Sequence, residues 1–327
     1  MSLTDFENKS VLITGGAGFI GSAIAKKLVD ASAKVTIVDS MIEEYGGNLR
    51  NIESIKDRVH FNITDVRDRH AMRYLIKNQD YLFNLAGQTS HMDSMQDPYT
   101  DLEINAKAQL SILEACRLFN PSVRVVFAST RQIYGKPEKL PVDETHPIRP
   151  VDVNGINKTA GEWYHLLYNQ VYDIPATVLR LTNTYGPGMR IKDARQTFVG
   201  VWIRNILEGK SFEVWGGEQL RDFNYVDDVV NAFIECATNS KAIGKVYNLG
   251  SSEVVSLKEL ADILTNAAGG DYVTKKFPKE RKKIDIGDYY SDYGLINSEL
   301  DWYPMISLLE GLNNTIDYYK KYLKDYV

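Results

Sequence analysis

The chain has 327 residues, of which 44% are hydrophobic and 25% charged, enough to bury a large core in one or two closely packed domains. The formal net charge of −5, with its basic residues balanced by nearby acids, excludes nucleic acid as the expected partner. Cys116 and Cys236 stand alone in separate helix-like runs and no run predicts a membrane span, so we expect a cytoplasmic protein without a disulfide framework.

The first half of the chain alternates short apolar segments with helical patterns. Six segments read as strands: 10–15, 34–39, 59–65, 80–87, 123–130 and 176–186. Apolar strands that alternate with helices predict a parallel sheet covered by helices on both faces. The expected fold class is therefore α/β, with a Rossmann-type doubly wound parallel sheet.

The second half of the chain has a more mixed pattern. Helices are expected over 197–209, 256–270 and 308–327, and short strands over 212–217 and 245–250. No flexible linker separates the two halves. We therefore expect a smaller mixed α/β lobe that packs directly on the first domain and closes one side of a substrate cleft.

A glycine-rich loop, LITGGAGFIG, joins the first strand to the first helix. Gly15 allows the tight turn, Gly18 lets the backbone approach a pyrophosphate, and Gly21 lets the helix pack against the sheet. Phe19 and Ile20 open the helix, whose N-terminus supplies amide donors and the positive end of a dipole. This arrangement predicts a dinucleotide-binding loop.

Residues at the ends of the next strands fit the same cofactor. Asp39 ends the second strand, where a carboxylate accepts hydrogen bonds from the adenosine ribose and repels a 2′-phosphate, which favours NAD over NADP. Asp65, followed by Val66, is placed to meet the adenine amino group. The fourth strand ends in a segment that allows the backbone to approach the cofactor, consisting of Leu85, Ala86 and Gly87.

Later motifs follow in the order of one known family. They read NLAGQTSH, LEINAKAQLSILEAC, FASTRQIYG, RLTNTYGP and QLRDFNYVDDVVNAF. With the glycine loop they resemble, over nearly the whole chain, the extended short-chain dehydrogenase/reductase family in its nucleotide-sugar-modifying branch. The resemblance implies that residues 1–180 bind NAD, with segments near 222–250 returning to that domain, and that residues 181–327 mainly bind a nucleoside-diphosphate sugar. It also implies a homodimer formed by the apolar faces of helices near 100–118 and 157–172.

The resemblance also assigns roles to single residues. Thr130 takes the place of the catalytic serine or threonine. Asn183 matches the asparagine that contacts the sugar nucleotide, and Arg221 matches the arginine that grips the diphosphate. Four more residues are assigned to the substrate by position: Gln88, Gln132, Tyr134 and Arg281. Trp215 is expected in the core rather than in the nucleotide wall, and no metal ion is expected.

One departure affects the family's catalytic YxxxK motif, which reads Asn154-Gly155-Ile156-Asn157-Lys158 here. The family tyrosine removes a proton from the sugar, but an amide cannot serve as a general base near neutral pH. Our hypothesis is that Lys158 still holds the nicotinamide ribose, Asn154 positions a hydroxyl or water, and another group takes the proton. His91, Arg131 and Tyr134 lie nearby by family position, and histidine has the ordinary pKa nearest neutrality. A purely structural role for His91 stays open.

A second departure follows Thr130. The related 4,6-dehydratases carry an acidic pair after this residue, and decarboxylating relatives keep a glutamate, whereas this chain has Arg131 and Gln132. Neither side chain does carboxyl chemistry, although Arg131 is suited to bind an anion or a sugar oxygen. The sequence therefore favours an NAD-dependent epimerase that acts through a transient keto-sugar, with oxidation expected at C4. The alternatives are a net dehydrogenase, a dehydratase with an unusual base, and a catalytically impaired protein that binds NAD and a nucleotide sugar.

Overall fold

The computed structural model describes residues 3–278 and 284–327. A large sheet has seven strands in the order β10-β6-β5-β4-β1-β2-β3, and all neighbouring pairs are parallel. The strands are β1 (Ser10–Thr14), β2 (Lys34–Asp39), β3 (His60–Ile63), β4 (Tyr81–Asn84), β5 (Arg124–Thr130), β6 (Ala176–Leu181) and β10 (Val246–Asn248).

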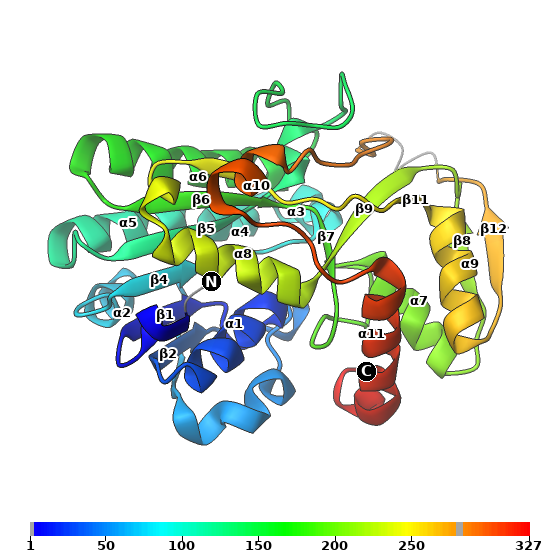
Figure 1. Cartoon of the computed structure of the whole chain (residues 1–327), viewed down its shortest axis with the longest axis horizontal. Coiled ribbons are helices and arrows are strands. Elements are labelled where there is room, and N and C mark those ends of the chain that lie inside the picture. The colour runs from blue at the N-terminus through cyan, green and yellow to red at the C-terminus, as the bar shows by residue number, and fades with distance from the viewer. Residues whose placement is uncertain (1–2, 279–283) are drawn as a thin grey trace.

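Helices cover both faces of this sheet and create a hydrophobic core on each (Figure 1). Along β1, Val11 and Ile13 belong to one core, whereas Leu12 between them belongs to the other, as expected from the alternation of side chains along a strand. The first core includes helices α1 (Phe19–Asp30) and α8 (Val226–Thr238). The second core includes helices α2 (Arg69–Leu75), α5 (Ala108–Phe119) and α6 (Val153–Tyr172).

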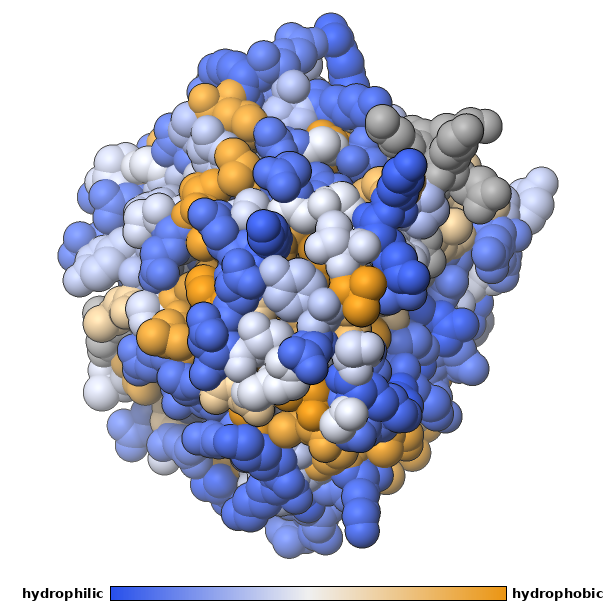
Figure 2. Space-filling view, turned by 90° about the vertical axis from the view of Figure 1, so that its right-hand side faces the viewer, coloured by the Kyte–Doolittle hydropathy of each residue, from blue (hydrophilic) through white to orange (hydrophobic). Residues whose placement is uncertain are grey.

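A smaller lobe lies to the right in Figure 1. It contains a sheet in the order β11-β9-β7 and a two-stranded pair, β12-β8. Its strands are β7 (Asn183–Tyr185), β8 (Phe212–Trp215), β9 (Leu220–Tyr225), β11 (Val254–Ser256) and β12 (Tyr272–Lys275). Its helices are α7 (Phe198–Leu207), α9 (Leu257–Ala268) and α11 (Leu308–Tyr322). The face of the molecule on this side is predominantly hydrophilic (Figure 2).

Three short helices complete the arrangement. Helices α3 (His91–Gln96) and α4 (Pro98–Leu102) follow β4 and pack against α6, and a π-helical turn at Glu103–Lys107 leads into α5. Helix α10 (Gly294–Leu300) contacts β10. The chain thus returns to the large sheet, through α8 and β10, after it has entered the smaller lobe.

The predicted fold class is confirmed, but several predicted strands are too long, and one of them is divided in two. Residues 176–186 form two strands rather than one, because the chain leaves the large sheet at Thr182 and joins the smaller one. The Thr182 hydroxyl donates to the buried carboxylate of Asp222, which fixes the crossing point. Cys116 and Cys236 are buried and unpaired. None of the helices in the described ranges is long and apolar enough to cross a membrane.

Candidate active site

A cavity of about 770 Å³ lies between the C-terminal edge of the large sheet and the smaller lobe. In open α/β sheets, this edge is where ligands bind. The lining begins at the glycine loop, passes the ends of β2, β4 and β5 and the start of α6, and continues to β7, β8 and β9. We call the part of the cavity over the first strands the cofactor half and the part that faces the smaller lobe the substrate half, after the ligands predicted for them.

The glycine loop provides a cradle that larger side chains would fill. Gly15 has φ +67°, and a Cβ there would lie 3.0 Å from the backbone nitrogen of Ala86. A Cβ on Gly21 would lie 2.3 Å from the carbonyl oxygen of Gly15. Helix α1 follows Gly18 without a side-chain cap, so its first N–H groups and positive dipole end are available to a phosphate. The cradle, with the cavity-lining residues Phe19 and Ile20, fits the pyrophosphate of NAD.

A buried network of hydrogen bonds joins the strand before this loop to β4 and α6. The Thr14 hydroxyl accepts from the backbone N–H groups of Leu85 and Ala86, both at 3.1 Å, and donates to Asn84 Oδ1 at 2.8 Å. Asn84 Nδ2 in turn lies 3.2 Å from His165 Nε2. Burial lowers the pKa of His165 to about 4, so the ring is neutral and Nε2 accepts this hydrogen bond. The loop is thereby tied to the middle of helix α6.

Two carboxylates mark the adenosine end of the cavity. Asp39 accepts from the backbone N–H groups of Ala17 at 3.0 Å and Met41 at 2.9 Å, and burial raises its pKa. Its remaining lone pairs can accept from ribose hydroxyls. Asp65 also lines the cavity, but its Oδ2 lies 2.7 Å from Arg67 Nη2, so an adenine amino group would share this carboxylate with Arg67. Four other predicted cofactor residues line the same half: Val66, Leu85, Ala86 and Gly87.

Lys158 and Thr130 lie where the two halves meet. Lys158 Nζ donates to the carbonyl oxygen of Ala128 at 3.1 Å, and burial lowers the pKa of the lysine to about 8. A Cβ on Gly87 would lie 2.9 Å from Nζ, so the glycine leaves room for the ammonium group. Thr130 ends β5, and its Oγ1 accepts from the N–H of Gln132 at 3.2 Å. Both residues line the cavity.

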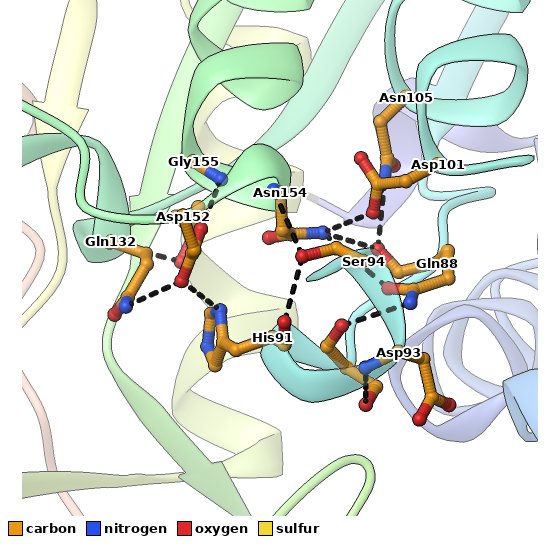
Figure 3. A network of polar contacts seen from close by, with 12 residues as sticks. Gln88, His91, Asp93, Ser94, Asp101, Asn105, Gln132, Asp152, Asn154 and Gly155 are labelled. Carbon is orange, nitrogen blue, oxygen red and sulfur yellow. Dashed lines mark hydrogen bonds and ion pairs between the residues drawn. The ribbon is translucent and has the colours of Figure 1, made fainter. Parts of the chain in front are cut away.

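Asn154 is held with its amide in one orientation (Figure 3). Its Nδ2 donates to the carbonyl oxygen of Gln88 at 2.8 Å and to Asp101 Oδ2 at 3.1 Å. A flipped amide would bring its own oxygen against these two acceptors. Asn154 Oδ1 accepts no hydrogen bond from the described residues and points away from Asp101 in Figure 3. Because Asn154 lines the cavity, this oxygen is an acceptor available to a ligand hydroxyl.

Asp101 is the centre of an amide cluster that the sequence did not reveal. This fully buried carboxylate accepts from Asn105 at 3.0 Å, from Asn154 at 3.1 Å and from Asn157 at 2.8 Å. Lys158 also lies within electrostatic reach of Asp101. The negative charge of Asp101 raises the lysine pKa, although burial lowers it by more. The four-residue spacing of Asp101 and Asn105, one helical turn apart, is the signal that could have suggested the pair.

His91 and Asp152 form a second pair beside Asn154 (Figure 3). His91 Nδ1 lies 3.0 Å from Asp152 Oδ2, within ion-pair distance but without hydrogen-bond geometry, and His91 lines the cavity. Burial acts to raise the pKa of Asp152, but the nearby His91 and two hydrogen-bond donors together outweigh it and lower the pKa. The donors are the N–H of Gly155 at 2.7 Å and Gln132 Nε2 at 2.9 Å. A carboxylate beside Nδ1 favours a proton on that nitrogen and leaves Nε2 as the free ring atom.

Two arginines reach the substrate half of the cavity. Arg131 Nη2 donates to Asn183 Oδ1 at 2.9 Å, and Asn183 Nδ2 donates to a β9 carbonyl at 2.9 Å. Arg221 Nη2 lies 3.7 Å from Asp285 Oδ1. Burial, reinforced by the charge of Arg131, lowers the pKa of Arg221 to about 10. All four residues line the cavity, as does Gln132.

Three predicted placements need correction. Tyr134 does not line the cavity: its side chain is fully buried, and its hydroxyl bonds with Asn248 and Arg180. Gln88 is also absent from the lining, because its side chain turns back to donate to the carbonyl oxygen of Ser90 at 2.9 Å. Trp215, expected in the core, is a wall of the cavity. Arg281 lies outside the described residues.

Comparisons with known proteins identify the family of this chain. Residues 11–250 match the NAD dependent epimerase/dehydratase family. The chain is 35% identical over 315 residues to a putative UDP-glucose 4-epimerase of Methanocaldococcus jannaschii, which covers 95% of this chain and 98% of the relative.

Solved structures give the same result. The UDP-glucose 4-epimerase of Thermotoga maritima with UDP-glucose superimposes with a TM-score of 0.88 and 30% identity, covering 96% of this chain and 99% of the other. The UDP-N-acetylglucosamine 4-epimerase of Methanobrevibacter ruminantium with UDP-N-acetylmuramic acid has a TM-score of 0.88 and 27% identity, with the same two coverages, 96% and 99%.

The chain therefore belongs to the NAD-dependent epimerase/dehydratase family. Its members among the relatives are enzymes of nucleotide-sugar metabolism, in the extended short-chain dehydrogenase/reductase class. The predicted family and the predicted cofactor, NAD, are both confirmed.

Proposed function

We propose that this chain is a nucleotide-sugar epimerase that oxidises a hexose carbon, C4 in the first instance, to a transient ketone and reduces it from the other face. One observation carries the proposal. Lys158, Thr130, Asn154 and His91 line the same cavity as the NAD cradle, where β5 and α6 meet α3. The relatives named as 4-epimerases support the same reaction class.

The distribution of carboxylates argues against elimination chemistry. Dehydration of a sugar needs an acid for the leaving hydroxyl and a base for the neighbouring carbon. The described carboxylates that line the cavity lie at the ends of β2 and β3 or in the smaller lobe, and they are Asp39, Asp65, Glu213 and Asp285. The turn that follows Thr130 presents Arg131 and Gln132 instead. This arrangement favours an epimerase or a net dehydrogenase over a dehydratase.

The residues of the chain bind the cofactor and the sugar and transfer the proton. NAD, when bound, would supply the redox chemistry by taking up the hydride of the sugar carbon and giving it back. Lys158, mostly protonated at pH 7, holds the nicotinamide ribose and stabilises negative charge on the reacting oxygen. Thr130 donates to the same sugar oxygen, and Asn154 Oδ1 accepts from a neighbouring hydroxyl or a water that it positions. His91 Nε2 takes the proton, and Asp152 balances the charge of the imidazolium.

A product analysis tests the reaction class. The purified protein is incubated with NAD and a panel of UDP-, GDP-, CDP- and dTDP-sugars, and the products are examined by mass spectrometry and proton NMR. Unchanged mass with altered ring couplings supports an epimerase and names the carbon. Loss of two hydrogens would instead show a net dehydrogenase, and loss of water would contradict the argument from Arg131 and Gln132. NAD binding without any product would favour a binding protein.

Replacing His91 tests the proposed base. His91→Gln is expected to lower kcat by about 10²–10⁴-fold, the range typical of a lost general base, and to remove the acidic limb of the pH–rate profile. His60→Gln, at an exposed position on β3, is the matched control and should leave both unchanged. An unaltered pH–rate profile in His91→Gln would remove His91 from the mechanism.

The homodimer and the cytoplasmic setting are part of the same proposal. Large apolar side chains are exposed along α5 and α6, and they include Leu118, Phe119, Trp163, Leu167, Val171 and Tyr172. Contiguous exposed apolar surface on a helix pair is typical of a protein interface. Light scattering should give twice the chain mass, and a monomer at micromolar concentration would contradict the dimer. The two buried, unpaired cysteines suit a reducing compartment.

A further inference from the structure

Asn51 joins three separate parts of the chain through one fully buried amide. It lies in the 3₁₀ helix Leu49–Arg58, between β2 and β3. Its Nδ2 donates to the carbonyl oxygen of Ala17, in the glycine loop, at 3.1 Å, and to that of Gly188, in the loop after β7, at 3.2 Å. Its Oδ1 accepts from the hydroxyl of Tyr326 at 2.6 Å. Turning the amide over would set its oxygen against two carbonyl oxygens, so the side chain is fixed in one orientation.

Ala17 connects this amide to the cofactor half of the cavity. Its N–H donates at 3.0 Å to Oδ2 of Asp39, the carboxylate predicted to bind the adenosine ribose. Its carbonyl oxygen accepts from the N–H of Asn48 at 3.1 Å, in addition to the bond from the buried amide. This carbonyl and the N–H of Gly18 belong to one planar peptide unit, and Gly18 directly precedes helix α1. Fixing the carbonyl therefore fixes the turn that presents the first N–H groups of α1 to a pyrophosphate.

Residues 318–326 hold the turn that carries Asn51. Asn48 Nδ2 donates to the carbonyl oxygen of Asp325 at 3.0 Å, and Arg50 Nε lies 3.3 Å from Asp325 Oδ2. The first of these contacts spans 277 positions of the chain. The surroundings of Asn51 therefore depend on the docking of a segment that is remote in sequence.

Tyrosine hydroxyls of the same segment complete the attachment. Tyr326 donates its proton to Asn51, so the hydroxyl of Tyr318, 2.6 Å away, donates to Tyr326. The Tyr319 hydroxyl donates to the carbonyl oxygen of Met189, in the loop after β7, at 2.6 Å. The segment thus binds both the Asn51 amide and the loop of the smaller lobe to which that amide donates.

We propose that Asn51 is a positioning residue for NAD, and that Tyr326 fixes its amide so that the glycine loop retains the cofactor. Neither residue lines the cavity. Asn51 acts through Ala17, and Tyr326 acts through Asn51. Retention matters for a reaction in which the same NAD takes up a hydride and gives it back. The proposal concerns the cofactor alone and applies whichever sugar is bound.

The rate of NAD exchange measures this retention. The NAD-loaded protein is mixed with excess isotopically labelled NAD, and mass spectrometry follows the replacement of the bound cofactor. Tyr326→Phe is expected to speed the exchange about 2–10-fold, as for one lost hydrogen bond. Asn51→Ala should speed it about 10–100-fold, because the bonds to both loop carbonyls are lost.

Two comparisons distinguish positioning from a general loss of stability. Tyr247→Phe removes the hydroxyl of another buried tyrosine, which donates to Glu299 Oε2 at 2.6 Å from β10, at the edge of the large sheet. It should lower Tm as Tyr326→Phe does, but exchange NAD at the wild-type rate. In the Asn51→Ala background, Tyr326→Phe should not speed the exchange further, because its hydroxyl acts through Asn51.

Three outcomes would overturn the proposal. The first is an unchanged exchange rate in Asn51→Ala or in Tyr326→Phe. The second is an additive effect of the two substitutions, and the third is an equal acceleration in Tyr247→Phe, which would reduce the effect to stability. If Asn51→Ala does not fold, the comparison of Tyr326→Phe with Tyr247→Phe decides alone. None of these outcomes depends on the sugar product, so the epimerase proposal stands or fails separately.

Discussion

The two halves of the cavity differ in how their polar groups are satisfied. In the cofactor half, the Thr14 hydroxyl, the Asn84 amide and the His165 ring form a closed network with the backbone. In the substrate half, Asn154 Oδ1 and Arg131 Nη1 have no hydrogen-bond partner among the described residues. The first half is built to be stable before NAD arrives, whereas the second is completed by its ligand. Substitutions should therefore affect stability in one half and turnover in the other.

Lys158 lies where the cofactor half meets the substrate half. Replacing it should give the largest effect and should change both turnover and stability. Lys158→Met is expected to lower kcat by about 10²–10³-fold, as for removal of one positioned donor. It should also stabilise the protein without NAD at pH 7, by at most about 3 kcal/mol, because a lysine whose pKa falls from 10.5 to about 8 is unfavourably buried while charged. This gain in stability is reduced because the carbonyl oxygen of Ala128 loses the hydrogen bond from Lys158.

The pH dependence of this gain has a definite sign. Below pH 8 Lys158 is protonated in both the folded and the unfolded chain, so the unfavourable burial is expressed in full. Between about pH 8 and 10.5 only the unfolded chain keeps the proton, so the wild type gains stability as the pH rises. Urea unfolding at pH 7 and pH 10 should show the advantage of Lys158→Met shrinking. The exposed Lys107→Met is the control, and an equal gain there would refute the argument.

Gly21→Ala should separate cofactor binding from the substrate half. The new Cβ would overlap the carbonyl oxygen of Gly15 at 2.3 Å, and backbone on both sides must shift. Overpacking typically costs about 1–3 kcal/mol of folding stability, and the displaced loop should also fit the pyrophosphate less well and lower NAD affinity about 10–100-fold. Fluorescence titration with NAD measures it. Ser22→Ala, one position further along the helix, should bind normally, and normal binding by Gly21→Ala would show that the loop is not rigid.

His165 should give the smallest effect, confined to acidic solution. Its pKa is lowered from 6.5 to about 4 by burial, so between these pH values only the unfolded chain takes up a proton. The wild type should lose up to about 3 kcal/mol of stability as the pH falls through this window. His165→Gln should lack that part of the pH dependence in unfolding measured at pH 7 and pH 4.5. The exposed His70→Gln should keep it, and identical pH curves for all three proteins would contradict the assigned network.

The cofactor half was predictable from sequence because its chemistry is local. Gly15, Gly18 and Gly21 lie within one turn between a strand and a helix, and Asp39 ends the next strand, so spacing alone brings them to one sheet edge. The substrate half depends on contacts between distant segments. His91 meets Asp152 across 61 positions by their numbers, and Asn154 meets Asp101 across 53.

The direction of individual side chains also could not be predicted from the sequence. Tyr134 follows Thr130 closely in sequence, yet the 3₁₀ turn sends its ring into a small core with Ile133, Val142 and Tyr289 instead of into the cavity. Gln88 lies beside Gly87 but points the other way. Adjacent residues at a strand end face opposite directions, and sequence position cannot say which one the turn will bring to the ligand.

The amide cluster around Asp101 couples position 154 to the residues around it. A tyrosine at position 154 could not reproduce the amide hydrogen that Asn154 gives to this carboxylate, and Asn105 and Asn157 would have to compensate for it. Asn154→Tyr alone should therefore lower the free energy of unfolding. The four residues form one hydrogen-bonded unit, so the effects of substituting them on the free energy of unfolding should not be additive.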